Sequence, residues 1–397
     1  MLNLILPIIL GIFSGTITGL IPGIHINLVA ISLLSLTFIQ NLPPTPLLIF
    51  IIAMAITHTF LDFIPSIFLG APSEDTSLSA LPGHELLLKG QGHNALKLTL
   101  IGSTMAIVSL AIIIPTFIFL IPKIYPFLQR MMGFLLIWIA ILLILNERED
   151  KIKATIIFLL AGFLGLASLN LQVNQPLLPL LTGLFATSTL IHSIKSNTIL
   201  PPQKIEKLTL PKSHIIKPTI ATILISPICS LFPGLGSSQA AIIASELSGK
   251  TTREQFLILL GSINTIVMSI SFITLILFQK SRTGAAFAIN QITQLTTQHL
   301  TLILTTIILT TIISIPLALQ ISKTTARNIH KIPYTLISKT TLIFLIIIIT
   351  YISGITGLLI LVTSTTLGLT CIEFGTRRGF LMGAILIPTI IFYLPFF

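Results

Sequence analysis

Two stretches interrupt apolar runs in the same way: Gly19-Leu-Ile-Pro-Gly-Ile-His-Ile-Asn27 and Ser230-Leu-Phe-Pro-Gly-Leu-Gly-Ser-Ser238. In each, Pro-Gly breaks a run with the composition of a membrane helix, and small polar residues follow. Proline lacks a backbone donor and glycine tolerates almost any backbone angle, so a helix is expected to break at both places. Inside a bilayer, the freed backbone groups must face protein or a wet cavity. The two stretches therefore predict an internal duplication around one buried polar site.

The composition is that of a polytopic membrane protein. Of the 397 residues, 53% are hydrophobic and 8% are charged, whereas soluble domains carry about 25% charged residues. The formal charge of +11 comes from basic residues in short loops between apolar runs. That pattern is typical of cytoplasmic loops and not of a nucleic-acid-binding face. We expect a multi-pass protein of the cytoplasmic membrane with no nucleic-acid partner.

The basic loops also predict a topology. If 4–40 and 218–245 enter the membrane and turn back at Pro-Gly, most Lys and Arg residues lie on the cytoplasmic side. Runs such as 98–122 and 131–146 then cross once each. Each half of the chain is then predicted to contain one re-entrant or broken helical hairpin and about five transmembrane helices. Whether the Pro-Gly segments are re-entrant or discontinuous spanning helices is left open.

In this topology the two hairpins enter from opposite sides, which makes an inverted repeat of the kind found in many secondary transporters. The predicted fold is therefore all-α, with a first repeat at 1–194, a basic cytoplasmic linker at 195–217 and a second repeat at 218–397. A rival pairing of Gly102-Ser103 with Gly261-Ser262 needs both segments in the same orientation. We set that pairing aside.

The half-helices that begin after the two breaks are expected to bind an anion. Their free amides and the positive end of the helix dipole point toward the turn. The alternative is an ordinary interfacial turn with polar capping residues. The candidate substrate-binding residues at the breaks are Pro22, Gly23, His25, Asn27, Pro233, Gly234, Gly236, Ser237 and Ser238.

A second group of candidates belongs to one predicted span and the segment Pro72-Ser-Glu-Asp-Thr-Ser77 that follows it. His58 and Asp62 are four residues apart and share a helix face. An ionisable pair inside a span suggests proton coupling or a relay, with a buried structural pair as the alternative. The acidic residues after the span either line the cavity or lie in an aqueous loop. The candidate ion-coupling residues are His58, Asp62, Glu74 and Asp75, and the candidate substrate contacts here are Ser73 and Thr76.

The second half offers three further candidates for substrate binding. Asn264 and Thr265 lie in the middle of a predicted span, where they would donate hydrogen bonds or form lone helix contacts. Arg282 follows that span and would complement an anionic substrate, or pair with an acid of the first half. Arg377 and Arg378 near the C-terminus are interpreted as marking the inner membrane boundary. Three glycines at four-residue spacing, Gly11, Gly15 and Gly19, predict close helix packing.

Enzymatic function is not indicated. The sequence contains no Asp-x-x-x-Asp pair, no His-Glu-x-x-His and no Gly-x-Ser-x-Gly. The glycine-rich stretch at 83–93 lacks the Gly-Lys-Ser/Thr of a phosphate loop. The two cysteines, Cys229 and Cys371, have no metal-ligand spacing. We expect neither a metal nor a cofactor, apart from a coupling H⁺ or Na⁺.

Several motifs, taken in order, resemble the large permease subunit of the tripartite tricarboxylate transporters. They are Gly15-x-x-x-Gly19-x-x-Pro22-Gly23, Gly70-Ala-Pro-Ser73, Lys89-Gly-Gln-Gly92 and Phe232-Pro-Gly-Leu-Gly236. The resemblance implies uptake of di- or tricarboxylates across the cytoplasmic membrane, driven by an ion gradient. It also implies a small membrane subunit and an extracytoplasmic solute-binding protein as partners.

The leading hypothesis is a secondary active transporter of a small organic anion, such as a carboxylate, bound between the two broken hairpins. The alternative is a flippase for a lipid-linked phosphate, because half-helix ends also suit a phosphate head-group. Co-purified lipid would favour the flippase. A homodimer is left open.

Overall fold

The computed structural model describes residues 2–22, 26, 29–30, 43–71, 76, 78, 80–147, 150–196, 200–231, 236–249 and 251–394. These residues form helices and connecting segments without strands. Seven helical segments are long and apolar enough to cross a membrane. The predicted all-α polytopic membrane fold is thereby confirmed.

The helices of the first half are α1 (Leu2–Leu20), α3 (Pro44–Leu61), α4 (Phe63–Phe68), α5 (Ala80–Leu88), α6 (Gly92–Leu145), α7 (Lys151–Asn170), α8 (Leu177–Leu181), the π-helix η3 (Thr182–Thr187) and α9 (Ser188–Lys195). Those of the second half are α10 (Lys212–Cys229), α11 (Ser237–Ser248), α12 (Arg253–Phe278), α13 (Gly284–Ile292), the 3₁₀-helix η4 (Thr297–His299), α14 (Leu300–Ile329), α15 (Tyr334–Glu373), the 3₁₀-helix η5 (Arg378–Met382) and α16 (Gly383–Tyr393).

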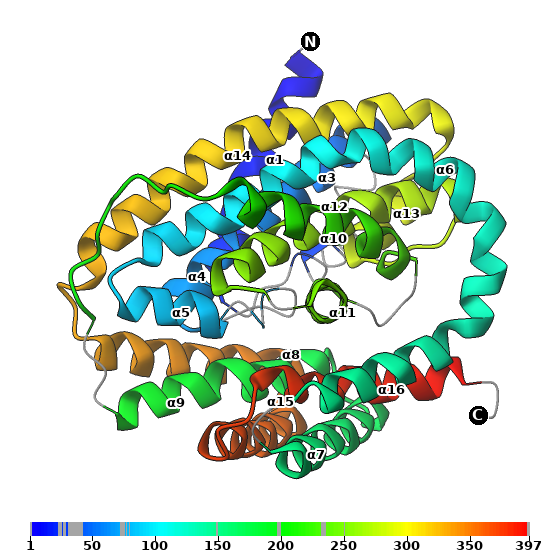
Figure 1. Cartoon of the computed structure of the whole chain (residues 1–397). Helices are drawn as coiled ribbons and strands as arrows, with labels where there is room; N and C mark the ends of the chain where they lie inside the picture. The colour runs from blue at the N-terminus through cyan, green and yellow to red at the C-terminus, as the bar shows by residue number, and fades with distance from the viewer. Residues whose placement is uncertain are drawn as a thin grey trace.

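The helices form two layers, which Figure 1 shows one above the other. The first layer contains α1, α3 to α5, the beginning of α6 and α10 to α14, with α12 packed against α6, α10 and α11. The second layer contains α7 to α9, α15 and α16, where α15 packs on η3 and α9 and α16 packs on α7. Each half of the chain therefore contributes to both layers.

The helix α6 joins the two layers. Its 54 residues would extend about 80 Å if straight, far more than the roughly 30 Å of a bilayer core. Figure 1 shows that α6 runs along the first layer, turns, and returns beside α16. Pro115, Pro122 and Pro126 lie in its middle, where proline weakens the hydrogen-bond ladder and permits a bend. The predicted crossings at 98–122 and 131–146 are thus two limbs of one bent helix and not separate helices.

The small-residue stripe of α1 packs against α3 as predicted. A Cβ atom on Gly11 would lie 2.6 Å from the carbonyl oxygen of Phe50, and one on Gly15 would lie 2.5 Å from that of Met54. Both positions require the absence of a side chain because the obstacle is backbone. The stripe holds α1 tightly on the buried helix that carries His58.

The closest approach of α6 and α12 is reciprocal. The Ser103 hydroxyl donates to the Gly261 carbonyl (3.1 Å), and the Ser262 hydroxyl donates to the Gly102 carbonyl (2.8 Å). A Cβ atom on either glycine would collide with the backbone of the other helix. Such mutual contacts are what a local two-fold axis produces.

These two helices also run in the same direction. Gly102 and Gly261 meet about ten residues after the start of each helix, and toward the far end the ring of Tyr125 lies 4.9 Å from that of Phe278, centroid to centroid. Gly102 and Gly261, whose pairing as equivalent repeat positions was set aside above, therefore lie in contact where two parallel helices cross. An inverted repeat that relates the complete halves stays a prediction.

Candidate functional site

In the first half, the buried polar site starts at a break between two helices whose residues are almost all buried. Helix α3 ends at Leu61, α4 begins at Phe63, and Asp62 lies between them, 2% exposed. Pro65 cannot donate a backbone hydrogen bond to the carbonyl of Leu61, which favours an interruption at this point. The break leaves a carboxylate inside the first layer.

Two residues of the second half lie against this carboxylate. Asn264, in the middle of α12, donates from Nδ2 to Oδ2 of Asp62 over 3.0 Å. Ser237, the first residue of α11, donates its hydroxyl to Oδ1 of Asn264 over 3.3 Å. All three side chains are buried. We call this chain of hydrogen bonds the Asp62 cluster; it joins the two halves of the sequence through three separately predicted residues.

Further hydroxyl and imidazole groups lie near the Asp62 cluster. His58 is one turn earlier on α3, and its Nδ1 is 3.1 Å from the hydroxyl of Thr18 on α1. The hydroxyl of Thr57 is 3.1 Å from that of Ser314 on α14. His58 is thus directed to α1, whereas Asp62 is directed to α12. Although His58 and Asp62 share a helix face, they therefore contact two different helices.

A comparison with known protein families shows which family the chain belongs to. The model of the tripartite tricarboxylate transporter TctA family matches residues 5–383. The chain belongs to the TctA family. The uncharacterized protein MJ1079 of Methanocaldococcus jannaschii is 30% identical over 415 residues, covering 99% of this chain and 100% of that protein. No solved structure matches the chain. The resemblance drawn from the motifs is confirmed, and this TctA-family protein is a multi-pass member of a transporter family.

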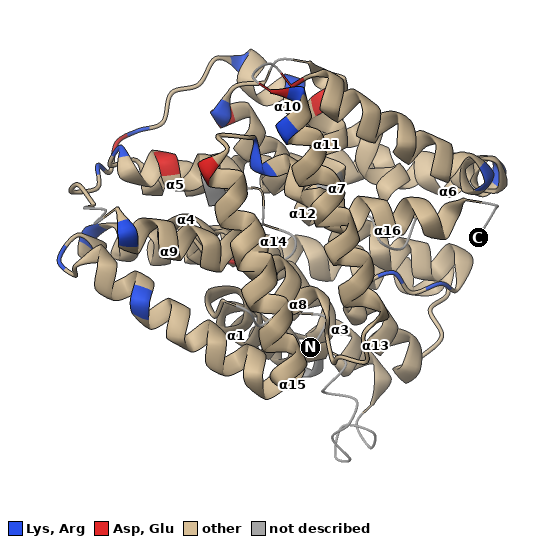
Figure 2. Ribbon diagram, turned by 90° about the horizontal axis from the view of Figure 1, so that it is seen from below, with Lys and Arg blue, Asp and Glu red and all other residues tan. Residues whose placement is uncertain are grey.

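Charged residues of this TctA-family chain lie mainly at the ends of its helices. Figure 2 shows Lys and Arg residues around α5, α9 and α10, with a smaller group at the bend of α6 and near α13. The helices between these groups are drawn mostly in tan and contain few charged residues. Such banding is expected of a protein whose two charged edges face water on opposite sides of a membrane.

The remaining predicted site residues are distributed as follows. Gly236 is the N-cap of α11, and Ser238 is buried in its first turn. Thr76 is buried, and its carbonyl accepts from the Ser66 hydroxyl over 3.4 Å. Thr265 is buried beside Asn264, with no described hydrogen-bond partner for its hydroxyl. Pro22 is half-buried just after α1. Gly23, His25, Asn27, Ser73, Glu74, Asp75, Pro233 and Gly234 lie outside the described residues.

Arg282 lies after α12 and close enough to Cys229, the last residue of α10, to act on it electrostatically. The second Pro-Gly stretch begins directly after that end of α10. Of the described residues on either side of the second Pro-Gly stretch, Cys229 thus lies near Arg282 and Ser237 belongs to the Asp62 cluster.

Two arginines that the sequence marked only as a membrane boundary form contacts between helices. Arg377 Nε is 2.7 Å from Oε2 of Glu147, and its Nη1 is 3.5 Å from Oε1 of Glu246 on α11. Arg378 is buried and contacts η3. Their roles depend on residues more than 100 positions away, so no local sequence signal could have revealed them.

Proposed function

We propose that this TctA-family protein is a secondary active permease that carries a small organic anion, a di- or tricarboxylate, across the cytoplasmic membrane. The Asp62 cluster is the observation that supports the proposal most strongly. It joins an ionisable residue between α3 and α4 to an asparagine in the middle of α12 and a serine at the start of α11. In membrane proteins, ionisable groups in such places mark substrate or ion pathways.

Coupling follows from the charge of Asp62. A carboxylate inside a low-dielectric layer repels an anionic substrate, because Coulomb energies grow as the dielectric constant falls. A cation bound at Asp62 removes that repulsion, so H⁺ or Na⁺ would enter with the substrate. His58 is a second candidate for the proton, and Glu74 and Asp75 remain candidates by position in the sequence.

The substrate would be held by neutral hydrogen-bond donors and by one positively charged side chain. The first turn of α11 offers backbone amides, the positive end of the helix dipole and the hydroxyls of Ser237 and Ser238. Asn264 and Thr265 on α12, and Arg282 after the end of α12, add further hydrogen-bond donors. By the same reasoning from sequence, the candidate substrate contacts of the first half are Pro22, Gly23, His25, Asn27, Ser73 and Thr76, with Pro233 and Gly234 at the second break.

The family membership also suggests partners and orientation. We infer a small membrane subunit and an extracytoplasmic binding protein that delivers the substrate, with the 195–217 segment on the cytoplasmic side. A family of tricarboxylate transporters does not favour the flippase alternative.

Uptake of radiolabelled citrate, succinate and malate into proteoliposomes that contain the protein together with its two inferred partners tests the proposal. We expect accumulation of at least one of these anions under an inward H⁺ or Na⁺ gradient and none when the gradient is collapsed. Asn264→Ala is expected to lower the uptake rate about tenfold or more, because it removes a hydrogen bond to a charged partner. Asn328→Ala, at an exposed position of α14, is the matched control. No uptake of any carboxylate under either gradient would exclude the proposed function.

A further inference from the structure

Helices α6 and α14 leave an open groove on the outside of the first layer. The two helices run in opposite directions, and α14 begins near the bend of α6 (Figure 1). At the other end they touch, because Nδ1 of His93 lies 3.0 Å from the hydroxyl oxygen of Ser322. Toward the bend, a groove of about 530 Å³ opens between them. Its volume falls within the range of ligand sites, about 300–1,000 Å³.

All the described residues that line this groove are apolar. Leucine and isoleucine side chains between residues 300 and 308 form the wall on α14. The wall on α6 includes a stripe at four-residue spacing, which keeps its members on one helix face: Ile107, Ala111, Pro115 and Phe119. Phe119 is 75% exposed. Since both helices are long and apolar enough to cross a membrane, this exposed apolar surface faces lipid.

The groove is about as long as one leaflet of a bilayer is deep. The stripe from Ile107 to Phe119 extends about 18 Å along the axis of α6. The hydrocarbon core of a bilayer is about 30 Å thick, so one leaflet contributes about 15 Å. At the inner end of the groove the two helices converge on the contact of His93 with Ser322. A lipid chain of one leaflet therefore matches the groove, whereas a transmembrane helix would need a groove through both leaflets.

Lys123 continues the stripe beyond the outer end of the groove. It follows Phe119 by four residues within α6, and it is exposed. Helical spacing thus places a positive charge directly after the last residue of the stripe. Tyr125 follows two residues later. Tyrosine and lysine at the end of an apolar span are typical of the boundary between membrane and water. The groove therefore runs from this boundary into the hydrocarbon region.

A second lysine lies at the same edge of the molecule. Lys280, which follows α12, places its Nζ 5.5 Å from the centroid of the Tyr125 ring. Segments 86–146 and 255–372, which include α6, α13 and α14, contain no Asp or Glu. In the described part of the chain, neither Lys123 nor Lys280 forms an ion pair. Figure 2 shows this basic edge at the bend of α6 and near α13. The edge is therefore complementary to a negatively charged group.

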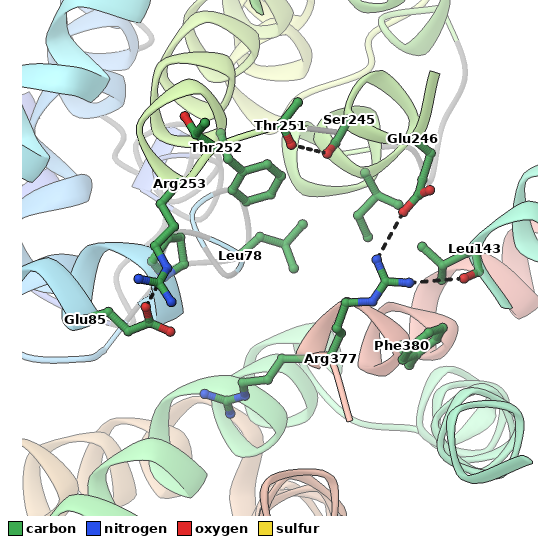
Figure 3. Close-up of a pocket in the computed structure, with 15 residues that line it drawn as sticks. Leu78, Glu85, Leu143, Ser245, Glu246, Thr251, Thr252, Arg253, Arg377 and Phe380 are labelled. Carbon is green, nitrogen blue, oxygen red and sulfur yellow. Dashed lines mark hydrogen bonds and ion pairs between the residues drawn. The ribbon is translucent and has the colours of Figure 1, made fainter. Parts of the chain in front are cut away.

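Another cavity, of about 290 Å³, differs from the groove in how its charges are arranged. It lies between α5, α11, the beginning of α12 and η5, and Figure 3 shows the side chains that line it. Two arginines on its walls are paired with acids: Arg253 with Glu85 (2.7 Å) and Arg377 with Glu246 (3.5 Å). The protein itself supplies the opposite charge for these arginines. For the lysines beside the groove, an anionic lipid head-group can supply it.

We propose that the groove between α6 and α14 binds an anionic phospholipid, with one hydrocarbon chain along the α6 stripe and the phosphate at Lys123 and Lys280. Apolar contact holds the chain, and the two lysines select the charge of the head-group. The Asp62 cluster is buried, whereas the groove opens toward lipid. The lipid is therefore a stabilising ligand and not a cargo, and its presence would not support the flippase alternative. The site does not depend on the proposed transport of carboxylates.

Thermal unfolding of the purified protein in detergent tests this site. The unfolding midpoint is measured against the concentration of two added lipids, because a ligand that binds only the folded protein raises the midpoint. Dioleoyl phosphatidylglycerol is anionic, and dioleoyl phosphatidylcholine has the same chains without a net charge.

Two exposed positions separate the head-group from the chain. The head-group variant is Lys123→Gln, and its control is Lys339→Gln, at an exposed lysine of α15. The chain variant is Ala111→Phe, which fills the groove with a bulky side chain. Its control is Val108→Phe, at an exposed residue of the same helix that does not line the groove. All four substitutions are at exposed positions, so the variants are expected to fold.

We expect phosphatidylglycerol to stabilise the wild-type protein at lower concentrations than phosphatidylcholine. Lys123→Gln should raise the apparent Kd for phosphatidylglycerol about fivefold, the usual contribution of one lysine near anionic lipid, and leave that for phosphatidylcholine unchanged. Ala111→Phe should raise the apparent Kd for both lipids about tenfold or more, because the hydrocarbon chain loses its place. Lys339→Gln and Val108→Phe should respond as the wild type does.

Equal stabilisation of the wild-type protein by the two lipids would overturn the proposal, and so would an Ala111→Phe variant that responds like Val108→Phe. If Ala111→Phe instead lowers the mass of the particle in detergent while its lipid response is intact, a second copy of the chain occupies the groove, and the proposal is equally wrong. None of these results affects the uptake experiment, so failure of this site and failure of the proposed function are distinguishable.

Discussion

Proteoliposomes that contain Asp62→Asn are expected to lose gradient-driven accumulation of carboxylate. The substitution keeps the shape of the side chain and an oxygen that can accept from Asn264, but it removes the negative charge that would bind the coupling cation. Since interactions with charged groups are worth about 1.5–3 kcal/mol, the initial rate should fall about tenfold to a hundredfold.

The variant also separates coupling from substrate binding. Exchange of external labelled anion for internal unlabelled anion needs no net movement of the cation, so we expect Asp62→Asn to retain exchange. Asp150→Asn is the matched control: Asp150 is the N-cap of α7, and asparagine caps a helix about as well as aspartate. Accumulation by Asp62→Asn at the rate of this control would show that Asp62 is not the coupling residue.

Alanine at Gly102 or Gly261 is expected to destabilise the protein by about 3 kcal/mol, the upper end of the usual cost of overpacking. A Cβ atom at either position would collide with backbone of the opposite helix, which cannot move without separating α6 from α12. The same separation would disturb the hydrogen bonds of Ser103 and Ser262.

The thermal unfolding midpoint in detergent measures this effect. Gly379→Ala is the control, because a Cβ atom there would meet no atom within 4 Å. We expect the midpoint to fall clearly for both helix-contact variants and to stay near the wild-type value for Gly379→Ala. Equal midpoints for Gly261→Ala and Gly379→Ala would mean that the two helices are not held together at this crossing.

The components of the Asp62 cluster could be predicted from the sequence because each is a polar residue within or beside an apolar run. Asp62 and Asn264 stand out in their spans for that reason alone, and Ser237 follows a helix break. Their contact could not be predicted, since it depends on how α3, α11 and α12 pack. The same limit applies to His58: helical spacing places it on the face of Asp62, but its partner Thr18 comes from another helix.

The topology was predicted in part. Composition and hydropathy were sufficient for the fold class, because few other folds accommodate so much apolar sequence. The distribution of Lys and Arg predicts which loops share a side, but it does not predict which helices touch. The reciprocal contact of Gly102 with Gly261 depends on that packing, and the correspondence of the two repeats stays a prediction. The runs 98–122 and 131–146 were predicted as separate crossings, and the chain bends between them without leaving the helix.

The environment of Arg378 was missed for a physical reason. Two consecutive arginines near a span are typical of a membrane boundary, and Arg377 fits that pattern because it is exposed. Arg378 is buried because η3 turns its carbonyl groups toward it, and the sequence Thr182-Gly-Leu-Phe-Ala-Thr187 has no periodicity that distinguishes a π-helix from an α-helix.

The place of a bound substrate tests most directly whether the Asp62 cluster is the transport site. A cryo-electron microscopy structure of the protein with a transported carboxylate should show density for a carboxylate oxygen within hydrogen-bond distance of Asn264 or Ser237. Density confined to other parts of the molecule, with the Asp62 cluster unchanged and free of ligand, would contradict this assignment.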